Sequence, residues 1–237
     1  VRGAGGALRP LWPALDVSLG VGDGLAVLAG EAVGELVVVA VGELQELARR
    51  GAMQARAVWR FFPARADAER LTLFDPATGA VTASVPLASA SEVDGAVAVA
   101  ADAFATWRNV SIARRTEIMF RFRELLVANK GDLAAAITAE HGKVLSDAAG
   151  EVQRGIENVE FACGAPNLLK GGFSHQISTG VDVSSILQPL GVVAGITPFN
   201  FPTMVPLWMI PNALVCGNAF ILKPSEKDPS AALLIAD

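Results

Sequence analysis

Apolar and polar positions along the chain form regular patterns from about residue 71 onward. Asp75–Gly79 has the composition of a tight turn, with an Asp that can accept from the backbone and a Gly suited to positive φ. Ala80–Pro86 then alternates as a short strand does. Ser91–Asp94 predicts a capping box that opens a helix ending near Trp107.

Three more helices are predicted in the middle of the chain. Ser111 caps the first, Asp132–Glu140 forms the second, and Ser146 opens the third. In the third, apolar side chains recur at helical spacing, at Val152, Ile156, Val159 and Cys163. A small antiparallel pair is expected around Gly171–Pro189.

The last fifty residues predict a parallel sheet. Gly191–Thr197 and Ala219–Leu222 read as strands buried on both faces, and a helix over Pro206–Val215 separates them. Asp228 followed by Pro229 predicts the N-cap and first position of another helix. The order indicates a right-handed βαβ unit. The fold class is therefore α/β, with N-terminal helices before an incomplete parallel sheet of Rossmann type.

Residues 1–70 show no such order. Between Gly20 and Gly42, glycine recurs too often for a helical or strand period, and the spacing lacks the third Gly of a dinucleotide-binding loop. Two interpretations remain for residues 1–70: a poorly ordered extension, or a leader translated from a start site placed too far upstream. We favour the second, and expect the folded domain to be 71–237.

Composition narrows the class of protein. The 237 residues are 52% hydrophobic and 18% charged, with a net charge of −5, which argues against a disordered chain and against a general nucleic-acid binder. No run reaches the roughly 20 apolar residues that a membrane-spanning helix needs. Two cysteines suit a reducing compartment, and two histidines far apart form no metal-ligand pattern. We expect a cytoplasmic protein with no bound metal.

Ligands of an open parallel sheet bind outside the carboxyl ends of its strands. The first segment there holds Asn200 between Pro198 and Pro202, so its carboxamide is held in a defined direction, as stabilisation of an oxyanion requires. The alternative is an Asn that satisfies its own turn backbone. In the second segment, Lys223 and Glu226 can donate to and accept from a ribose, unless they form only a solvated turn.

Arg154 lies on the predicted helix that Ser146 opens, on the side away from its apolar face. It is either a solvated surface side chain or a planar fork that binds a substrate carboxylate.

Together these segments resemble the aldehyde dehydrogenase superfamily, and within it the CoA-acylating branch that acts on methylmalonate semialdehyde. The resemblance runs from about Leu71 to Asp237. The segments that carry the resemblance are Glu151–Phe161 (EVQRGIENVEF), Ala165–Gly171 (APNLLKG), Pro198–Met209 (PFNFPTMVPLWM) and the Lys223–Lys227 loop.

The resemblance implies a reaction and a set of roles. In this superfamily a cysteine thiolate attacks an aldehyde, hydride passes to NAD and a thioester is left. Asn200 matches the side chain that donates to the intermediate's oxygen, and Arg154 the arginine for the substrate carboxylate. Thr197 and Phe199 match positions lining the NAD site, and the adenosine-ribose loop is matched by Lys223, Ser225, Glu226 and Lys227. The branch transfers its acyl group to CoA, giving propionyl-CoA or acetyl-CoA after loss of CO2.

The nucleophile has no match in this sequence. Cys163 and Cys216 read as small buried apolar residues outside the family's catalytic motif. We therefore expect an N-terminal fragment that is inactive alone, from an enzyme that the family predicts to be a homotetramer with a small-molecule semialdehyde substrate and no nucleic-acid or membrane partner. The alternatives are an aldehyde dehydrogenase that releases a free acid, and a non-catalytic truncated chain that binds a partner.

Overall fold

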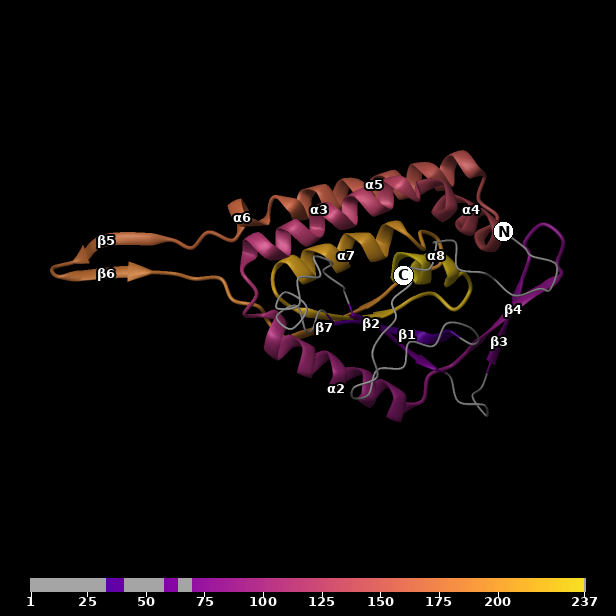
Figure 1. The fold of residues 1–237 in the computed structure, drawn as a ribbon, viewed down its shortest axis with the longest axis horizontal. Coiled ribbons are helices and arrows are strands. Elements are labelled where there is room, and N and C mark those ends of the chain that lie inside the picture. The colour runs from indigo at the N-terminus through magenta and orange to yellow at the C-terminus, as the bar shows by residue number, and fades with distance from the viewer. Residues whose placement is uncertain (1–32, 41–57, 64–69, 237) are drawn as a thin grey trace, which may run out of the picture. The chain divides into compact units, whose positions relative to one another are not determined.

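The computed structural model describes residues 33–40, 58–63 and 70–236, and side chains from residue 70 onward. All of these residues belong to one unit, Ala32–Asp237. Its main sheet has the strand order β2 (Val58–Pro63), β1 (Val33–Ala40), β8 (Ala219–Lys223), β7 (Val192–Ile196) (Figure 1).

The pairing of β7 with β8 is parallel, with Val192 opposite Ala219 and Ile196 opposite Lys223. The helix between them is α7 (Met204–Val215). The predicted βαβ unit and the α/β fold class are confirmed. Because the two strands run in the same direction, the loops that follow Ile196 and Lys223 leave the sheet at the same edge.

The structure differs from the sequence prediction in the N-terminal region. Strands β1 and β2 pair with each other, and β1 runs antiparallel to β8, so the described sheet is mixed. The glycine-rich sequence between Gly20 and Gly42 predicted no strand, although it contains β1. The β-branched run Val37–Val39 provides the local preference for a strand, and pairing with β8 provides the tertiary context. The rest of residues 1–69 lies outside the described part.

Seven helices are described, and α7 packs on one face of the sheet while α2 packs on the other (Figure 1). Strand β8 divides its side chains between them: Ala219 and Ile221 pack with α2, and Phe220 and Leu222 with the cluster around α7. Helix α2 spans Ala90–Trp107. The remaining helices are α3 (Ile112–Ala128), α4 (Lys130–His141), α5 (Leu145–Cys163), α6 (Ala165–Leu168) and α8 (Ser230–Ala236).

Helix α5 forms an outer layer with α3 and α4. It contacts all three of α3, α4 and α7, and its buried stripe includes the predicted Val152, Ile156 and Val159. Gly155 allows the closest approach to α7, since a Cβ atom there would lie 2.5 Å from Leu207 Cδ1. The layer therefore fixes α5 against the helix that follows the first site loop.

Strand β7 corrects a further expectation, because it is not buried on both faces. Gly195 is buried, but Ile196 is 79% exposed. The reason is its position: β8 is covered on both faces, whereas β7 is the last strand of the described sheet.

Two helix starts also differ from prediction. The capping box is formed by Ser89 and Glu92, whose carboxylate reaches back to the Ser89 N–H at 2.7 Å, because Glu is long enough to do so. Helix α8 begins at Ser230, and its N–H donates to Glu140 of α4 at 2.9 Å, which replaces the predicted cap at Asp228. The Ser111 cap of α3 is confirmed.

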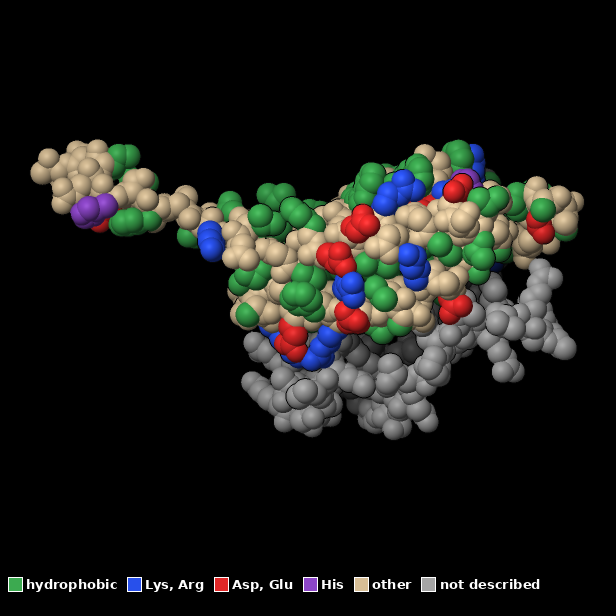
Figure 2. Space-filling view, turned by 90° about the horizontal axis from the view of Figure 1, so that it is seen from above, with side chains coloured by type: hydrophobic (Ala, Val, Ile, Leu, Met, Phe, Trp, Pro, Cys, Tyr) green, Lys and Arg blue, Asp and Glu red, His purple; other side chains and the backbone are tan. Residues whose placement is uncertain are grey.

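Two hairpins complete the described chain. Strands β3 (Arg70–Phe74) and β4 (Val81–Pro86) meet at the predicted turn, where Asp75 Oδ1 accepts from Ala77 N at 2.7 Å. Strands β5 (Phe173–Ser178) and β6 (Val181–Ser184) form the expected antiparallel pair, and every residue in them is exposed. Figure 2 shows this second pair standing clear of the helices. Among the described helices, none is long and apolar enough to cross a membrane.

Candidate functional site

The Asn200 loop connects the end of β7 to the start of α7. Asn200 is exposed, and its carboxamide makes no hydrogen bond to the described residues, so the alternative of an Asn bonded to its own turn is not what the structure contains. Its backbone carbonyl instead accepts a hydrogen bond from Lys143 Nζ at 2.9 Å. The backbone is anchored while the side chain is left available.

Glu151 holds the other end of this loop. Its side chain is fully buried on α5, and Oε1 accepts from the backbone N–H of Thr203 at 2.9 Å and of Met204 at 3.2 Å. A carboxylate at these N–H groups neutralises the positive end of α7. Glu151 Oε2 forms an ion pair with Lys143 Nζ at 2.5 Å.

Phe201 brings Arg154 to the same loop. The Arg154 guanidinium carbon lies 5.8 Å from the centre of the Phe201 ring, and Lys143 Nζ lies 4.4 Å from it. Arg154 follows Glu151 by three residues on α5, so both point toward the loop side of the helix. The guanidinium is exposed and stands beside the segment that carries Asn200.

The second loop follows β8. Lys223 Nζ and Glu226 Oε2 form an ion pair at 2.7 Å, and this hydrogen bond is the main cause that lowers the pKa of Glu226. Ser225 Oγ accepts from the Lys227 N–H at 3.1 Å, which folds the loop on itself. The loop therefore presents a charged carboxylate beside two ammonium groups.

The two loops are joined directly. Thr197 N donates to the Lys223 carbonyl at 3.1 Å, and Lys227 Nζ lies 4.2 Å from the centre of the Phe199 ring. The His141 ring also stacks on Phe199, with the two ring centres 6.4 Å apart. Thr197 is 5% exposed, and its Oγ1 is buried without a hydrogen-bond partner among the described residues. All the residues singled out from the sequence lie on these two loops, except Arg154, which reaches them from α5.

The profile of the aldehyde dehydrogenase family matches residues 62–237. The chain belongs to this family. The match begins within β2, a few residues before the boundary expected from the sequence.

The curated relatives that match this chain carry related names. Over 165 residues the chain is 54% identical to malonate-semialdehyde dehydrogenase of Pseudomonas aeruginosa, which covers 70% of this chain and 33% of that protein. It is 50% identical over 167 residues to the mitochondrial acylating methylmalonate-semialdehyde dehydrogenase of Arabidopsis thaliana, covering 70% and 28%. The chain thus spans about a third of the length of these relatives.

Solved structures that resemble this chain carry names of the same kind as the curated relatives. A methylmalonate-semialdehyde dehydrogenase from Oceanimonas doudoroffii superposes with a TM-score of 0.73 at 46% identity, over 86% of this chain and 37% of that one. A Sinorhizobium meliloti protein described as a methylmalonate-semialdehyde dehydrogenase complexed with NAD gives 0.72 at 43% identity, over 75% and 36%.

The structure adds residues that the sequence reasoning missed, namely Lys143, Glu151, Phe201 and His141. One signal was present: Glu151 falls on the same helical stripe as Val152 and Ile156, and a charged residue on an apolar stripe indicates a buried partner. The partner itself could not be read, because Lys143 lies in the loop before α5 and the amides lie 52 residues or more away.

Neither cysteine has the surroundings of a nucleophile. Cys163 packs against the core cluster around Ile210, and Cys216 ends α7. Burial raises the pKa of both thiols, which disfavours the thiolate. Among the described residues, no three His, Cys, Asp or Glu side chains are grouped as a metal site.

Proposed function

We propose that the protein carrying this chain is an NAD-dependent dehydrogenase that oxidises and decarboxylates malonate or methylmalonate semialdehyde and transfers the acyl group to CoA. The observation that carries the proposal is the convergence of Asn200, Arg154 and the Lys223–Lys227 loop at one edge of the sheet. The names of the relatives support the same substrate class.

Asn200 is proposed as the donor to the developing oxyanion. Its carboxamide is exposed and unbonded within the described chain, while its backbone is held by Lys143. A donor fixed in advance stabilises charge in the transition state without reorganisation.

Arg154 is proposed as the carboxylate clamp. Its exposed guanidinium lies on the Phe201 ring, next to Asn200, and a guanidinium can bind a carboxylate through two parallel hydrogen bonds. A semialdehyde acid has an aldehyde and a carboxylate a few atoms apart, so Asn200 and an Arg that lies beside the following residue suit both ends of it.

NAD fits the second loop. When bound, it accepts the hydride removed from the substrate. The donor and acceptor groups suited to its adenosine ribose are Lys223 and Glu226, with Ser225 and Lys227 shaping the loop. The unpaired Thr197 Oγ1 and the half-exposed Phe199 line the approach between the loops. Because Glu226 is held as a carboxylate, it repels the extra phosphate of NADP.

The nucleophile, the assembly and the location are also proposals. With both thiols of the chain disfavoured, we place the catalytic cysteine outside these 237 residues and expect the chain alone to be inactive. A homotetramer is supported by the exposed apolar side chains of the β5–β6 pair, where Phe173 is 69% and Ile177 64% exposed. The two free cysteines suit the cytoplasm.

A chimera tests the function. Residues 71–237 replace the matching segment of the Pseudomonas aeruginosa relative, and NADH formation from malonate semialdehyde is measured with CoA present. We expect turnover and acetyl-CoA as the product, and a kcat lowered about 100- to 1,000-fold by Asn200→Ala. The unaltered relative is the control. A folded chimera that binds NAD yet leaves the semialdehyde unchanged contradicts the proposal.

A second measurement does not depend on the chimera. Saturation-transfer NMR on the 237-residue chain compares NAD with NADP, with Glu226→Ala as the altered site. We expect binding of NAD over NADP, and loss of that preference in the variant. Absence of NAD binding by the folded chain contradicts the cofactor assignment.

A further inference from the structure

We propose that Lys143 is a positioning residue for Asn200, acting as one unit with Glu151. The inference rests on the proposed function of Asn200 and extends it to a residue pair that the sequence reasoning did not find. Lys143 does not contact the Asn200 side chain. It acts through the backbone of the loop that carries it.

Lys143 makes three contacts that converge on the loop. Its Nζ donates to the Asn200 carbonyl at 2.9 Å and to Glu151 Oε2 at 2.5 Å, and it lies 4.4 Å from the centre of the Phe201 ring. The Lys143 side chain is 13% exposed. One ammonium group thus connects α5 to the two residues at the tip of the loop.

Glu151 completes the anchor from the other side. The amides of Thr203 and Met204 donate to its Oε1, while its Oε2 binds Lys143. The segment from the Asn200 carbonyl to the Met204 amide is therefore held at both ends by a single ion pair. Between these ends, Pro202 restricts the backbone further.

The burial of the pair explains why it acts as a fixed point. Glu151 has no exposed surface, so its negative charge depends on Lys143 and on the two amides for compensation. Removing the ammonium group leaves a buried carboxylate without its cation, and the carbonyl of Asn200 without its donor. The Asn200 backbone then keeps the two prolines and the Glu151 contacts at Thr203 and Met204, but loses its own side-chain donor.

The same anchor serves Arg154. Arg154 follows Glu151 by three residues and rests on the Phe201 ring, which Lys143 also contacts. The two groups proposed to act on the semialdehyde are thereby fixed relative to each other through one ion pair. A displacement of about 1 Å at such a site can lower a rate about 100-fold.

A double-mutant cycle in the chimera tests the proposal. Lys143→Met is made in the wild-type background and in the Asn200→Ala background. We expect kcat to fall on the order of 10- to 100-fold in the first and less than about threefold in the second, because a residue that acts through Asn200 has nothing left to position. KM for NAD is expected to stay within about twofold in both backgrounds. An equal fall in both backgrounds overturns the proposal.

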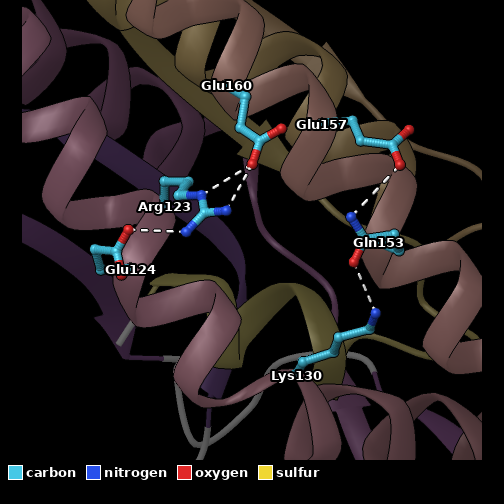
Figure 3. Close-up of polar contacts among 6 residues, drawn as sticks. All are labelled: Arg123, Glu124, Lys130, Gln153, Glu157 and Glu160. Atoms are coloured by element: carbon cyan, nitrogen blue, oxygen red, sulfur yellow. Dashed lines mark hydrogen bonds and ion pairs between the residues drawn. The ribbon is translucent and has the colours of Figure 1, made fainter.

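Lys130→Met is the matched control. Lys130 Nζ also binds α5, at Gln153 Oε1 and 2.7 Å, two residues after Glu151 in the sequence (Figure 3). Among the described residues, it makes no hydrogen bond to the Asn200 loop. The same Lys-to-Met change there is expected to leave kcat within about twofold. A fall in kcat equal to that of Lys143→Met would assign the effect to loss of a lysine on α5 and overturn the proposal.

Two further measurements test the proposal, and the first of them remains possible if Lys143→Met prevents folding. Lys143→Arg retains a cation, and we expect it to recover most of the wild-type kcat, with no effect in the Asn200→Ala background. Hydrogen exchange of the Thr203 and Met204 amides is measured in the 237-residue chain, where the Met variant is expected to exchange at least tenfold faster. Unchanged exchange overturns the anchor.

Failure of the proposed function is distinguishable. An inactive unaltered chimera contradicts the dehydrogenase assignment, while the exchange measurement still decides whether Lys143 and Glu151 hold the loop.

Discussion

Asp228 differs from the other carboxyl groups near the two loops. Glu140 accepts two hydrogen bonds from Ser230, and Glu151 has the Lys143 ammonium group and two amides. Asp228 is 2% exposed, and burial raises its pKa to about 7. The charges of Glu140 and Glu151 contribute to this rise in the pKa, whereas Ser225 and Lys143 oppose it. Its folded state therefore favours the protonated acid.

This predicts that the contribution of Asp228 to the stability of the fold falls as the pH rises from about 4 to about 7. In the unfolded chain Asp228 ionises near its ordinary pKa, whereas the folded chain keeps the proton until about pH 7, so the unfolded state binds fewer protons across this window. Asp228→Asn removes this titration. We expect the free energy of unfolding of the variant, relative to that of the wild type, to increase by on the order of 1–2 kcal/mol as the pH rises from 5 to 7.5.

Urea denaturation at the two pH values measures that gain. Burial also raises the pKa of Glu140, and this group is present in both proteins. An identical pH dependence in wild type and variant shows that Asp228 keeps an ordinary pKa.

Arg154 supports a prediction about specificity. Arg154→Leu in the chimera removes the planar fork and is expected to raise KM for malonate semialdehyde at least tenfold, since a hydrogen-bonded charge pair with the substrate is lost. A simple aldehyde without a carboxylate is expected to keep its KM within about twofold. Equal losses for the two substrates show that Arg154 does not bind the carboxylate.

Much of the candidate site followed from the sequence, because two parallel strands place their following loops at one edge. That rule brought together Asn200 and Lys223, and the structure joins their loops through Thr197 N and the Lys223 carbonyl. The Lys143–Glu151 pair could not be foreseen, since long-range partners leave no trace in local spacing. The same limit hid the cap of α8, where Glu140 and Ser230 are 90 residues apart.

At the scale of elements, the sequence predicted the local signals and the β7–β8 and β5–β6 pairings, but not the pairings of β1. The Asp75 turn and the Ser111 cap were predicted from composition alone. The two serines at 89 and 91 each have an acidic residue three positions later, and the structure uses the pair with Glu92. The antiparallel placement of β1 beside β8 depends on tertiary contacts, which a glycine-rich text does not reveal.

The contact of α5 with α7 gives a prediction for the element that carries Arg154. A Cβ atom at Gly155 would lie 2.5 Å from Leu207 Cδ1 and 3.1 Å from Leu207 Cβ, and Leu207 is fully buried. Gly155→Ala is expected to cost about 1–3 kcal/mol of stability through overpacking, partly offset by about 1 kcal/mol of helix propensity. The midpoint of urea denaturation measures the net loss.

Gly150→Ala is the control on the same helix. No atom lies within 4 Å of a Cβ placed there, so only the propensity gain of about 1 kcal/mol is expected. If both alanine variants stabilise the chain equally, the two helices do not approach as closely as described.

At the scale of the whole molecule, the described chain exposes large apolar side chains of a kind that is often found at interfaces. Leu190, which precedes β7, is 89% exposed, and Ile196, the last residue of β7, is 79% exposed. Every residue of the β5–β6 pair is exposed as well. Such surface favours further contacts, which agrees with the proposed homotetramer. The chain covers about a third of the length of its curated relatives.

The most direct test of the proposed chemistry is the amount of NADH released per active site of the chimera, from malonate semialdehyde and NAD, with and without CoA. Transfer of a cysteine thioester to CoA predicts sustained release with CoA. Without CoA it predicts a burst of about one NADH per site, because the acyl-enzyme accumulates. Sustained release without CoA, with a free acid as the product, would contradict the CoA-acylating assignment and establish the hydrolytic alternative.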